Sequence, residues 1–304
     1  MTNRRTYTRG VVNGMLTAIC YGTNPLFAMP MILAGIGTNS ILFYRYFFAS
    51  LIYGAFLKLV KKRSLRISLR EFAALLFLAL LFSFSSITLF ASFRYIDVGV
   101  SCTLLFAYPS LVAVISAIFF REKLTGAVIP AIGVSTLGVA LLTLTGGGGE
   151  GTLSTRGILL ALSSALLYAL YIVGVRQMKS IRRLKSDKLN FYVMLFGLMI
   201  YVCNLRFCFE LQGLHTPLLL GYALLLAIIP TIISLETLTV AIKLIGATRA
   251  AILGALEPLT AIIVGVAFFG EQLSWRICTG FLLIVSGVLL IVARPHKGGT
   301  DPRR

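Results

Sequence analysis

Three ionisable residues occur inside long apolar stretches of this sequence, where a charge is costly and therefore indicates either a function or a structural partner. The first is Glu257, which lies about nine residues into an apolar run and directly precedes Pro258. Its carboxyl group could bind an amine or carry a proton. It could equally hydrogen-bond the backbone carbonyl that a proline leaves free one turn earlier in a helix. The sequence leaves both roles open.

Arg45 and Glu236 are the other two residues of this kind. Arg45 could hold a substrate carboxylate or phosphate through its fork of N–H donors. It lies close to one end of its apolar run, so we favour two other roles: its long side chain extends to the nearby membrane surface, or it fixes the packing of helices. Glu236 precedes Lys243 by two helical turns, and we expect it to pair with Lys243 or to meet water at the mouth of a cavity.

Hydroxyl-bearing residues recur at helical spacing in the same apolar stretches. Ser85, Thr88 and Ser92 lie on one helical face, and Ser234 and Thr237 repeat that face further along the chain. Two such stripes suit the walls of a polar cavity, and they also suit contacts between membrane helices. Six further residues are candidates for lining the cavity: Asn13, Tyr21, Asn24, Tyr108, Tyr168 and Tyr171. Three prolines are candidate hinges, because proline interrupts helical hydrogen bonding: Pro25, Pro109 and Pro258.

The sequence contains no pattern that predicts catalysis or a bound metal. The motifs HExxH and GxSxG are absent, and no pair of aspartates lies within the apolar runs. The glycine-rich stretch 146–151 lacks the Lys-Ser/Thr that follows the glycines of a phosphate-binding loop, so we interpret it as a linker. We therefore expect no enzyme activity, no cofactor and no metal.

Composition indicates that the solvent of these apolar stretches is lipid. Hydrophobic residues make up 58% of the 304 residues and charged residues 12%, and the mean hydropathy is +0.93. Soluble domains carry about 45–50% apolar and about 25% charged residues. A spanning helix needs about 20 apolar residues. That length predicts an all-α integral membrane protein with ten transmembrane helices at 10–33, 39–58, 71–93, 98–119, 126–145, 157–175, 189–208, 217–242, 248–269 and 274–293.

The distribution of Lys and Arg predicts how these helices are oriented. If the N-terminus is cytoplasmic, 23 of the 28 basic residues fall on the cytoplasmic side and four on the outside. This asymmetry follows the positive-inside rule. We therefore expect a multi-pass protein of the cell inner (cytoplasmic) membrane with both termini cytoplasmic. The net charge of +18 is then explained by basic loops on the cytoplasmic side of the lipid bilayer. We therefore expect the bilayer as a partner and no nucleic acid.

The sequence repeats itself at an offset of 149 residues. Gly138 corresponds to Gly287, and both the hydroxyl stripes and the motifs FFREKL and FFGEQL match in this register. The pattern predicts two repeats, at 10–145 and 157–294, joined by the Gly-rich linker 146–156. Because each repeat holds five helices, an odd number, the two would cross the membrane in opposite directions. Inverted repeats around a central cavity are the construction of many secondary transporters.

The residues of both repeats resemble the EamA-type permeases of the drug/metabolite transporter superfamily. The second-half pattern is the run IKLIGATRAAILGALEP, which ends at Pro258, followed by GEQL at 270–273. The first half matches through Arg45, the run 95–109 and REKL at 121–124. The resemblance covers nearly the whole chain. It implies two inverted five-helix bundles around a central cavity. Known members export amino acids and other metabolites, and some relatives move nucleotide sugars or sugar phosphates.

These observations predict a secondary transporter that exports a small, amino-acid-like metabolite by alternating access and works as a monomer. Protons are a candidate coupling ion. The first and sixth helices contain no Asp or Glu, unlike the first helix of the small multidrug relatives, so Glu257 would have to carry the proton. We expect the first, third, fourth, sixth, eighth and ninth helices to enclose the cavity. The alternatives are an importer or a multidrug, nucleoside or sugar transporter of the same fold, with a channel or an intramembrane enzyme less consistent with the sequence.

Overall fold

The computed structural model describes residues 4–62, 64–92, 95–96, 101, 104–121, 126, 128–143, 154–269 and 275–292. Within these residues every regular element is a helix and no strand occurs, which confirms the predicted all-α class. Most of the predicted linker 146–156 lies outside the described residues, as do the acidic ends of the motifs at 119–124 and 268–273.

The helices of the first half fall in the intervals that the apolar runs predict. They are α1 (Arg4–Gly22), α2 (Asn24–Leu33), α3 (Thr38–Ala55), the π-helix η1 (Phe56–Val60), α4 (Leu69–Ser92), α6 (Tyr108–Phe120) and α7 (Val128–Thr143).

Within the described residues, the regular elements of the second half of the chain are also all helices. Its helices are α8 (Thr155–Gln177), α9 (Lys179–Arg183), α10 (Ser186–Asn204), α11 (Pro217–Ala227), the π-helix η2 (Ile228–Ile233), α12 (Ser234–Ile245), α13 (Ala247–Leu253), α14 (Leu256–Phe269) and α15 (Trp275–Val292).

The length and composition of several helices suit a lipid bilayer. A helix satisfies its backbone hydrogen bonds internally, which hydrocarbon requires of any segment that crosses it. Large apolar side chains on the outside of the bundle, such as Leu137 and Leu282, are more than half exposed, as lipid contact requires. In the described part of the chain, five stretches are long and apolar enough to span a membrane: Arg5–Leu33, Thr38–Val60, Leu69–Leu89, Thr155–Gln177 and Pro217–Ile245.

Local side-chain hydrogen bonds begin two of these helices. At the start of α4, the Ser68 backbone N–H donates to the Glu71 carboxylate at 2.7 Å, and the Glu71 N–H donates to the Ser68 hydroxyl at 3.3 Å. This reciprocal pair is a capping box, written in the sequence as S-x-x-E. At α11, Thr216 accepts from the Leu219 N–H, and Pro217 occupies the first turn, where no N–H is needed.

Each of the three predicted hinge prolines lies in the first turn of a helix that follows a break. Pro25 follows the interruption at Thr23 between α1 and α2. Pro109 is the second residue of α6, and Pro258 is the third residue of α14, directly after the turn at Gly254. A proline is tolerated there because the first N–H groups of a helix have no partner within it. These prolines therefore begin new helical segments and do not kink continuous ones.

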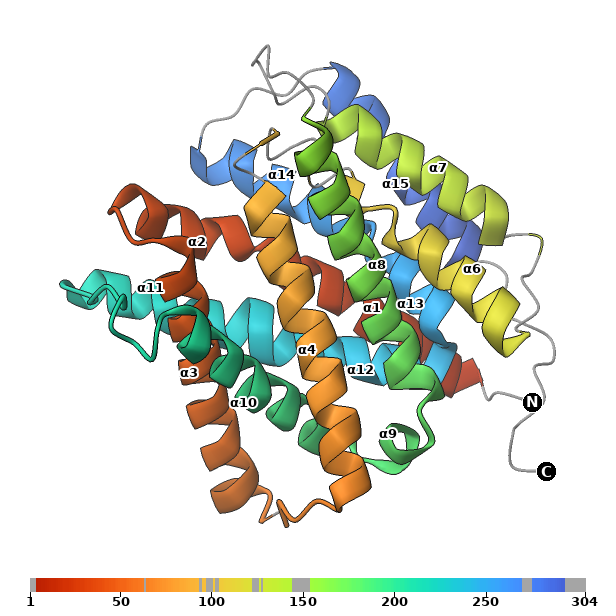
Figure 1. The fold of residues 1–304 in the computed structure, drawn as a ribbon. Helices are drawn as coiled ribbons and strands as arrows, with labels where there is room; N and C mark the ends of the chain where they lie inside the picture. The colour runs from red at the N-terminus through yellow and green to blue at the C-terminus, as the bar shows by residue number, and fades with distance from the viewer. Residues whose placement is uncertain are drawn as a thin grey trace.

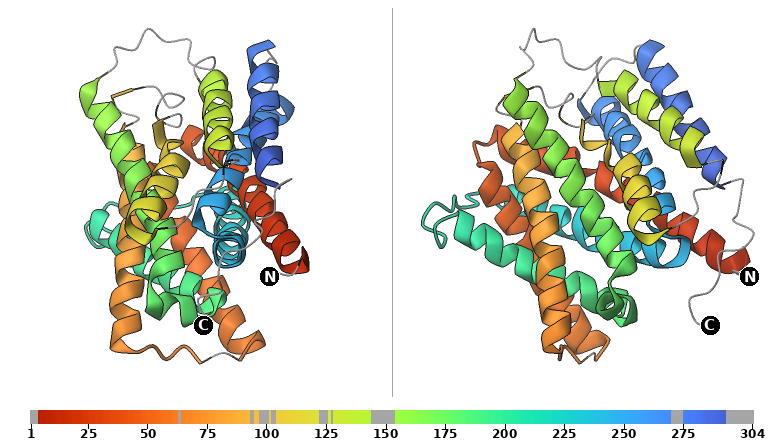
Figure 2. Two further views of the ribbon diagram at one scale, coloured as in Figure 1. Left: turned by 90° about the vertical axis from the view of Figure 1, so that its right-hand side faces the viewer. Right: turned by 45° about the vertical axis from the view of Figure 1, so that its right-hand side comes forward.

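The helices pack in pairs that join the two halves of the chain. Helix α4 lies along α8, α1 lies along α12, and α7 lies along α15, while α3 packs against α10 (Figure 1). The left view of Figure 2 places α4 and α8 on one side of the molecule and α1 and α15 on the other. Neighbouring helices in space therefore come mostly from different halves of the sequence.

The contact between α7 and α15 repeats at the offset of 149 residues. A side chain at Gly138 would collide with Ile284, and a side chain at Gly287 would collide with Ser135. Gly138 and Gly287 are 149 residues apart, and so are Ser135 and Ile284. Small residues allow membrane helices to approach closely, and here the same close approach is made twice by corresponding residues.

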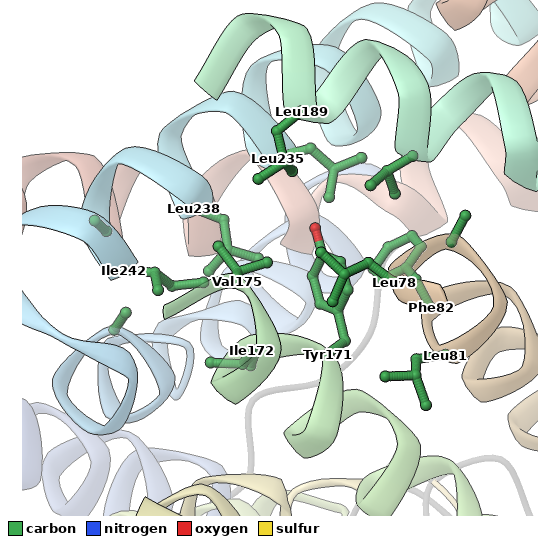
Figure 3. Packing of buried hydrophobic residues seen from close by; sticks show 14 of the residues in the cluster. Leu78, Leu81, Phe82, Tyr171, Ile172, Val175, Leu189, Leu235, Leu238 and Ile242 are labelled. Atoms are coloured by element: carbon green, nitrogen blue, oxygen red, sulfur yellow. The ribbon is translucent and has the colours of Figure 1, made fainter. Parts of the chain in front are cut away.

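The central part of the molecule is filled by apolar side chains from both halves. Figure 3 shows Tyr171 and Ile172 of α8 among Leu78 and Phe82 of α4 and Leu235 of α12. Tyr171 and Leu78 are fully buried. This packing holds α4, α8 and α12 together and so fixes the positions of the polar residues that those helices carry.

Candidate functional site

Arg45 of α3 is buried and contacts η2, which matches the expected role in helix packing and not an extension to the membrane surface. Only 7% of the residue is exposed. Its Nε donates to Thr231 Oγ1 at 2.6 Å and its Nη2 donates to the Pro230 carbonyl at 3.1 Å. The Pro230 carbonyl lies in the π-helix η2, where the regular α-helical hydrogen-bond ladder is interrupted. The Thr231 hydroxyl also donates to the Leu226 carbonyl at 2.8 Å, one turn before the proline. The guanidinium group also lies over the Tyr21 ring, 5.4 Å from its centroid.

Glu257 lies in the first turn of α14, where the unpaired N–H groups of the helix favour a negative charge. Its own backbone N–H donates to the Gly254 carbonyl at 2.9 Å. Among the described residues, no side chain donates a hydrogen bond to its carboxyl group. The positive charge of Arg45 lies within electrostatic range of that carboxyl group. The two groups thus offer opposite charges to one region of the bundle.

Tyrosine rings from two helices surround this region. The rings of Tyr108 in α6 and Tyr168 in α8 are packed edge to face, 4.8 Å between centroids, and Phe82 of α4 lies 6.0 Å from Tyr168. The Tyr108 hydroxyl donates to the Ala251 carbonyl at 3.1 Å and is within electrostatic range of Glu257, as is that of Tyr168. Aromatic faces beside a carboxylate and a guanidinium suit an organic ligand that carries both charge and apolar surface.

The predicted hydroxyl stripes lie at contacts between helices. Ser85 of α4 donates to the Ser164 carbonyl of α8 at 3.0 Å, and Ser164 donates back to the Ser85 carbonyl at 2.7 Å. Ser234 of α12 donates to the Thr17 carbonyl of α1 at 3.3 Å, and the Thr17 hydroxyl donates to Thr237 Oγ1 at 2.8 Å. These five hydroxyl groups join helices of different halves.

The hydroxyl groups of Thr88 and Ser92 hydrogen-bond residues that are close to them in the sequence. Thr88 donates to the Phe84 carbonyl at 2.9 Å, one turn earlier in α4. Ser92, at the end of α4, donates to the Leu89 carbonyl at 2.6 Å and to Ser101 Oγ at 2.9 Å. Both hydroxyls therefore have partners within the same half of the chain.

Three other candidates also have neighbours in the protein. The Asn13 amide donates to the Arg9 carbonyl at 2.7 Å, one turn earlier in α1. The Asn24 amide donates to the Tyr21 carbonyl at 2.8 Å, across the break between α1 and α2. Tyr171 lies in the apolar core (Figure 3). The structure thus gathers Tyr21, Arg45, Tyr108, Tyr168 and Glu257. The Tyr171 ring adjoins this group, 6.2 Å from the ring of Tyr168, while the amides of Asn13 and Asn24 bind backbone carbonyls close in the sequence.

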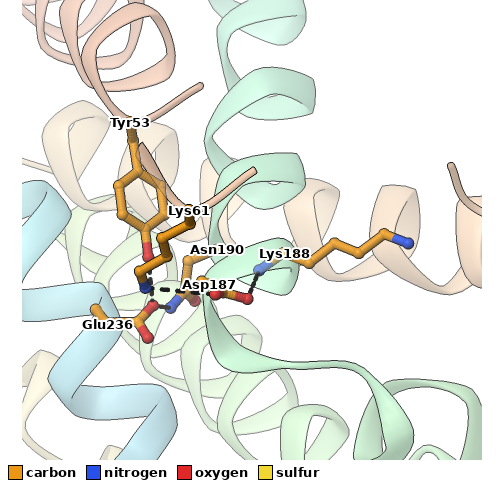
Figure 4. A network of polar contacts seen from close by, with 6 residues as sticks. All are labelled: Tyr53, Lys61, Asp187, Lys188, Asn190 and Glu236. Atoms are coloured by element: carbon orange, nitrogen blue, oxygen red, sulfur yellow. Dashed lines mark hydrogen bonds and ion pairs between the residues drawn. The ribbon is translucent and has the colours of Figure 1, made fainter. Parts of the chain in front are cut away.

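Glu236 belongs to a separate polar network at the first turn of α12 (Figure 4). Its Oε2 accepts from the Tyr53 hydroxyl of α3 at 2.8 Å and from the Asn190 amide of α10 at 2.7 Å. The expected pairing with Lys243 is wrong, because the Lys243 ammonium donates instead to the Leu184 carbonyl at 2.5 Å. Glu236 therefore joins three helices at one end of the bundle.

Five residues of these contacts were not singled out by the sequence analysis: Thr17, Tyr53, Ser164, Asn190 and Thr231. For Thr17 and Ser164 a signal existed, since the first helices of the two halves match at an offset of 147 residues, which aligns these two positions. Asn190 is an amide in an apolar run, which also marks a residue that needs a partner in lipid. Tyr53 and Thr231 carry no such signal, because hydroxyl groups are common in membrane helices.

Comparison with known proteins gives a consistent family match. The sequence pattern of the EamA-like transporter family matches residues 8–144 and 155–293. The chain is 28% identical over 149 residues to the protein named uncharacterized transporter YwfM of Bacillus subtilis (strain 168), and this match covers 49% of each chain. It is 28% identical over 206 residues to uncharacterized transporter sll1319 of Synechocystis sp. (strain ATCC 27184 / PCC 6803 / Kazusa), covering 67% of this chain and 62% of that protein.

The matched segments thus span about half and about three fifths of the lengths of those two relatives. A solved crystal structure superposes with a TM-score of 0.79 at 18% sequence identity, covering 93% of this chain and 96% of the other. At that identity the likeness concerns the fold alone.

Proposed function

Because the chain belongs to the EamA-like transporter family, we propose that it exports a small, amino-acid-like metabolite across the inner membrane by alternating access. The family and the names of its relatives make it a multi-pass membrane transporter. The substrate class, the direction and the mechanism are our proposal.

The observation that carries the substrate class is that the Arg45 guanidinium lies within electrostatic range of the Glu257 carboxyl group, in one region of the bundle. A guanidinium fork suits a carboxylate, and a carboxylate without hydrogen-bond donors of its own suits an ammonium group. An amino acid presents both groups on one carbon. The rings of Tyr21, Tyr108 and Tyr168 beside them would contact its side chain.

The mechanism we propose rests on two inverted repeats, at 10–145 and 157–294, with five spans in each. The matched contacts of Gly138 and Gly287 support it, as does the pairing of α4 with α8 and of α1 with α12. If corresponding helices make corresponding contacts, opening one end of the bundle and opening the other are equivalent movements. That equivalence is what alternating access requires.

Counterflow in proteoliposomes tests the proposal. Purified protein is reconstituted with an excess of one unlabelled amino acid inside, and entry of the same radiolabelled amino acid is followed for aromatic, aliphatic and cationic amino acids. We expect counterflow for one class, and we expect Arg45→Gln to reduce it more than tenfold. The matched control is Arg206→Gln, which removes an arginine that is 81% exposed and pairs only with Glu210 at the surface.

Absence of counterflow for every class, in protein shown to be folded and inserted, would contradict the amino-acid proposal. The search would then turn to nucleosides, sugars and drug-like cations. Equal counterflow in Arg45→Gln and Arg206→Gln would contradict the role of Arg45 in substrate binding while leaving the transport activity established.

A further inference from the structure

Two basic stretches of the chain meet at the end of the bundle that the sequence predicts to be cytoplasmic. Residues 58–70 and 176–188 each contain six Lys or Arg residues. They are held together by direct contacts: the Lys188 ammonium donates to the Arg66 carbonyl, and the Tyr192 hydroxyl donates to the Leu65 carbonyl. The two stretches therefore form one surface with a strongly positive field.

A cavity of about 360 Å³ opens between these stretches. Leu57 and Leu184 form apolar parts of its wall, and the other lining residues are polar or charged: Ser64, Glu71, Arg183, Lys185, Asp187 and Lys188. A volume of this size accommodates a phosphate group together with its ester substituent.

The two carboxylates of the cavity already have partners. Asp187 lies 3.4 Å from the Lys61 ammonium and accepts from the Lys188 backbone N–H at 2.7 Å (Figure 4). Glu71 accepts from the Ser68 N–H at 2.7 Å and from the Ser68 hydroxyl at 3.1 Å. Neither carboxylate is therefore the main counter-charge for the rest of the cavity.

Arg183 and Lys185, by contrast, have no acidic partner. Both are exposed at the rim, and within the described residues neither lies within 4.0 Å of a carboxylate oxygen. They stand on either side of Leu184, whose carbonyl binds Lys243, so the backbone that carries them is fixed. Two cations that have no carboxylate partner among the described residues thus extend from one fixed backbone segment over the cavity. Their N–H groups are available to donate to an anion.

We propose that this cavity binds an anionic phosphate group, with Arg183 and Lys185 as its principal contacts. Two sources of that chemistry are a headgroup of an anionic phospholipid and a free phosphate. Exposed apolar side chains near the cavity in the sequence favour the lipid. Leu59 and Leu69, each two residues from a lining residue, are 71% and 84% exposed and would contact acyl chains. Basic pockets between helices at the cytoplasmic surface bind anionic lipid headgroups in this way. The inference stands independently of the transported substrate.

Binding to the purified full-length protein tests the proposal, and it needs no transport assay. Native mass spectrometry measures retention of phosphatidylglycerol and of phosphatidylcholine, and a thermal-shift titration measures inorganic phosphate. The test variant is Arg183→Gln/Lys185→Gln. The control is Lys179→Gln/Arg182→Gln, which removes the same charge from exposed residues of the same stretch that do not line the cavity.

We expect the test variant to weaken phosphatidylglycerol binding roughly tenfold or more, with the control within about twofold of the unmodified protein. Phosphatidylcholine binding should be weaker and insensitive to both variants. Binding of inorganic phosphate alone, with the same sensitivity, would assign the cavity to free phosphate. Equal weakening by both double variants would reduce the effect to general surface charge and overturn the proposal, as would unchanged phosphatidylglycerol binding in a test variant that unfolds at the normal temperature.

Discussion

Ser85 and Ser164 each donate their hydroxyl hydrogen to the other's backbone carbonyl, at 3.0 and 2.7 Å, across the contact between α4 and α8. Thr17 and Ser234 meet at the corresponding contact between α1 and α12, where the Ser234 hydroxyl donates to the Thr17 carbonyl at 3.3 Å and the Thr17 hydroxyl lies 2.8 Å from Thr237 Oγ1. Ser85 and Ser234 are 149 residues apart. The two halves thus join the same kind of helix pair through hydroxyl groups at corresponding positions.

These reciprocal bonds should contribute measurable stability. Hydrogen bonds between membrane helices are worth about 0.6 kcal/mol each on average, so we expect Ser85→Ala/Ser164→Ala to lower the free energy of unfolding by about 1 kcal/mol. Thermal unfolding in detergent micelles measures the change. The control is Thr279→Ala, whose hydroxyl donates to the Trp275 carbonyl within its own helix. Equal destabilisation by both changes would mean that the contact between helices adds nothing.

Glu257→Gln should abolish any dependence of transport on a pH gradient. Glutamine preserves the shape of the side chain but removes both the charge and the group that exchanges a proton. We also expect apparent affinity for a substrate with an ammonium group to fall about tenfold or more, because hydrogen bonds to charged groups are worth about 1.5–3 kcal/mol. Counterflow at several pH values measures both effects. Glu210→Gln, which alters an exposed carboxylate, is the control; an unchanged pH profile in folded Glu257→Gln protein would remove the proton-carrier role.

Gly254→Ala should destabilise the turn before α14. An added Cβ would overlap the Tyr108 hydroxyl and would break its hydrogen bond to the Ala251 carbonyl. Overpacking of this kind costs about 1–3 kcal/mol. Adding Tyr108→Phe removes the colliding oxygen and should recover part of the loss. Gly133→Ala in α7 is the matched control, because its added Cβ meets nothing within 4 Å. Thermal unfolding of the four proteins gives the comparison, and a Gly254→Ala protein as stable as the control would refute the proposed overlap.

Replacing Glu236 should loosen the end of the bundle where α3, α10 and α12 meet. Glu236→Leu leaves the Tyr53 hydroxyl and the Asn190 amide without their acceptor, at a cost of about 1–3 kcal/mol for each group left unsatisfied. Glu236→Gln keeps an acceptor oxygen and should cost less. Adding Tyr53→Phe to Glu236→Leu should restore part of the stability, because the unsatisfied hydroxyl is then gone while the Asn190 amide still lacks its acceptor. Urea or thermal unfolding measures this cycle, and strictly additive losses would show that the two residues are not coupled.

Much of the fold follows from short-range properties of the sequence. The length of the apolar runs predicts helices because hydrocarbon offers no hydrogen bonds to an unpaired backbone. The capping box at Ser68 and Glu71 and the break before Pro25 are equally local and can be read directly. The offset of 149 residues identifies Gly138 and Gly287 as corresponding positions, although their contact partners become known only from the packing of α7 and α15.

The functional region was only partly predictable, because the partners of its side chains also depend on helix packing. The sequence alone selected Arg45 and Glu257, because charge in an apolar run is rare and costly. It could not determine where the long arginine side chain goes. Both the surface and the interior lie within its reach, and the choice depends on Thr231 and the Pro230 carbonyl, which lie about 185 residues further along the chain.

The sequence by itself thus indicated that the apolar segments lie in lipid, that the fold is helical and which family the chain belongs to. It also identified the ionisable residues within the apolar runs. The tertiary structure alone decided which of those polar groups meet. Glu236 binds Tyr53 and Asn190 and not Lys243, and Ser85 binds Ser164. The physical reason is that a hydrogen bond needs its partner within about 3 Å. Spacing along one helix fixes a face, but only the packing of helices from both halves brings two faces that close together.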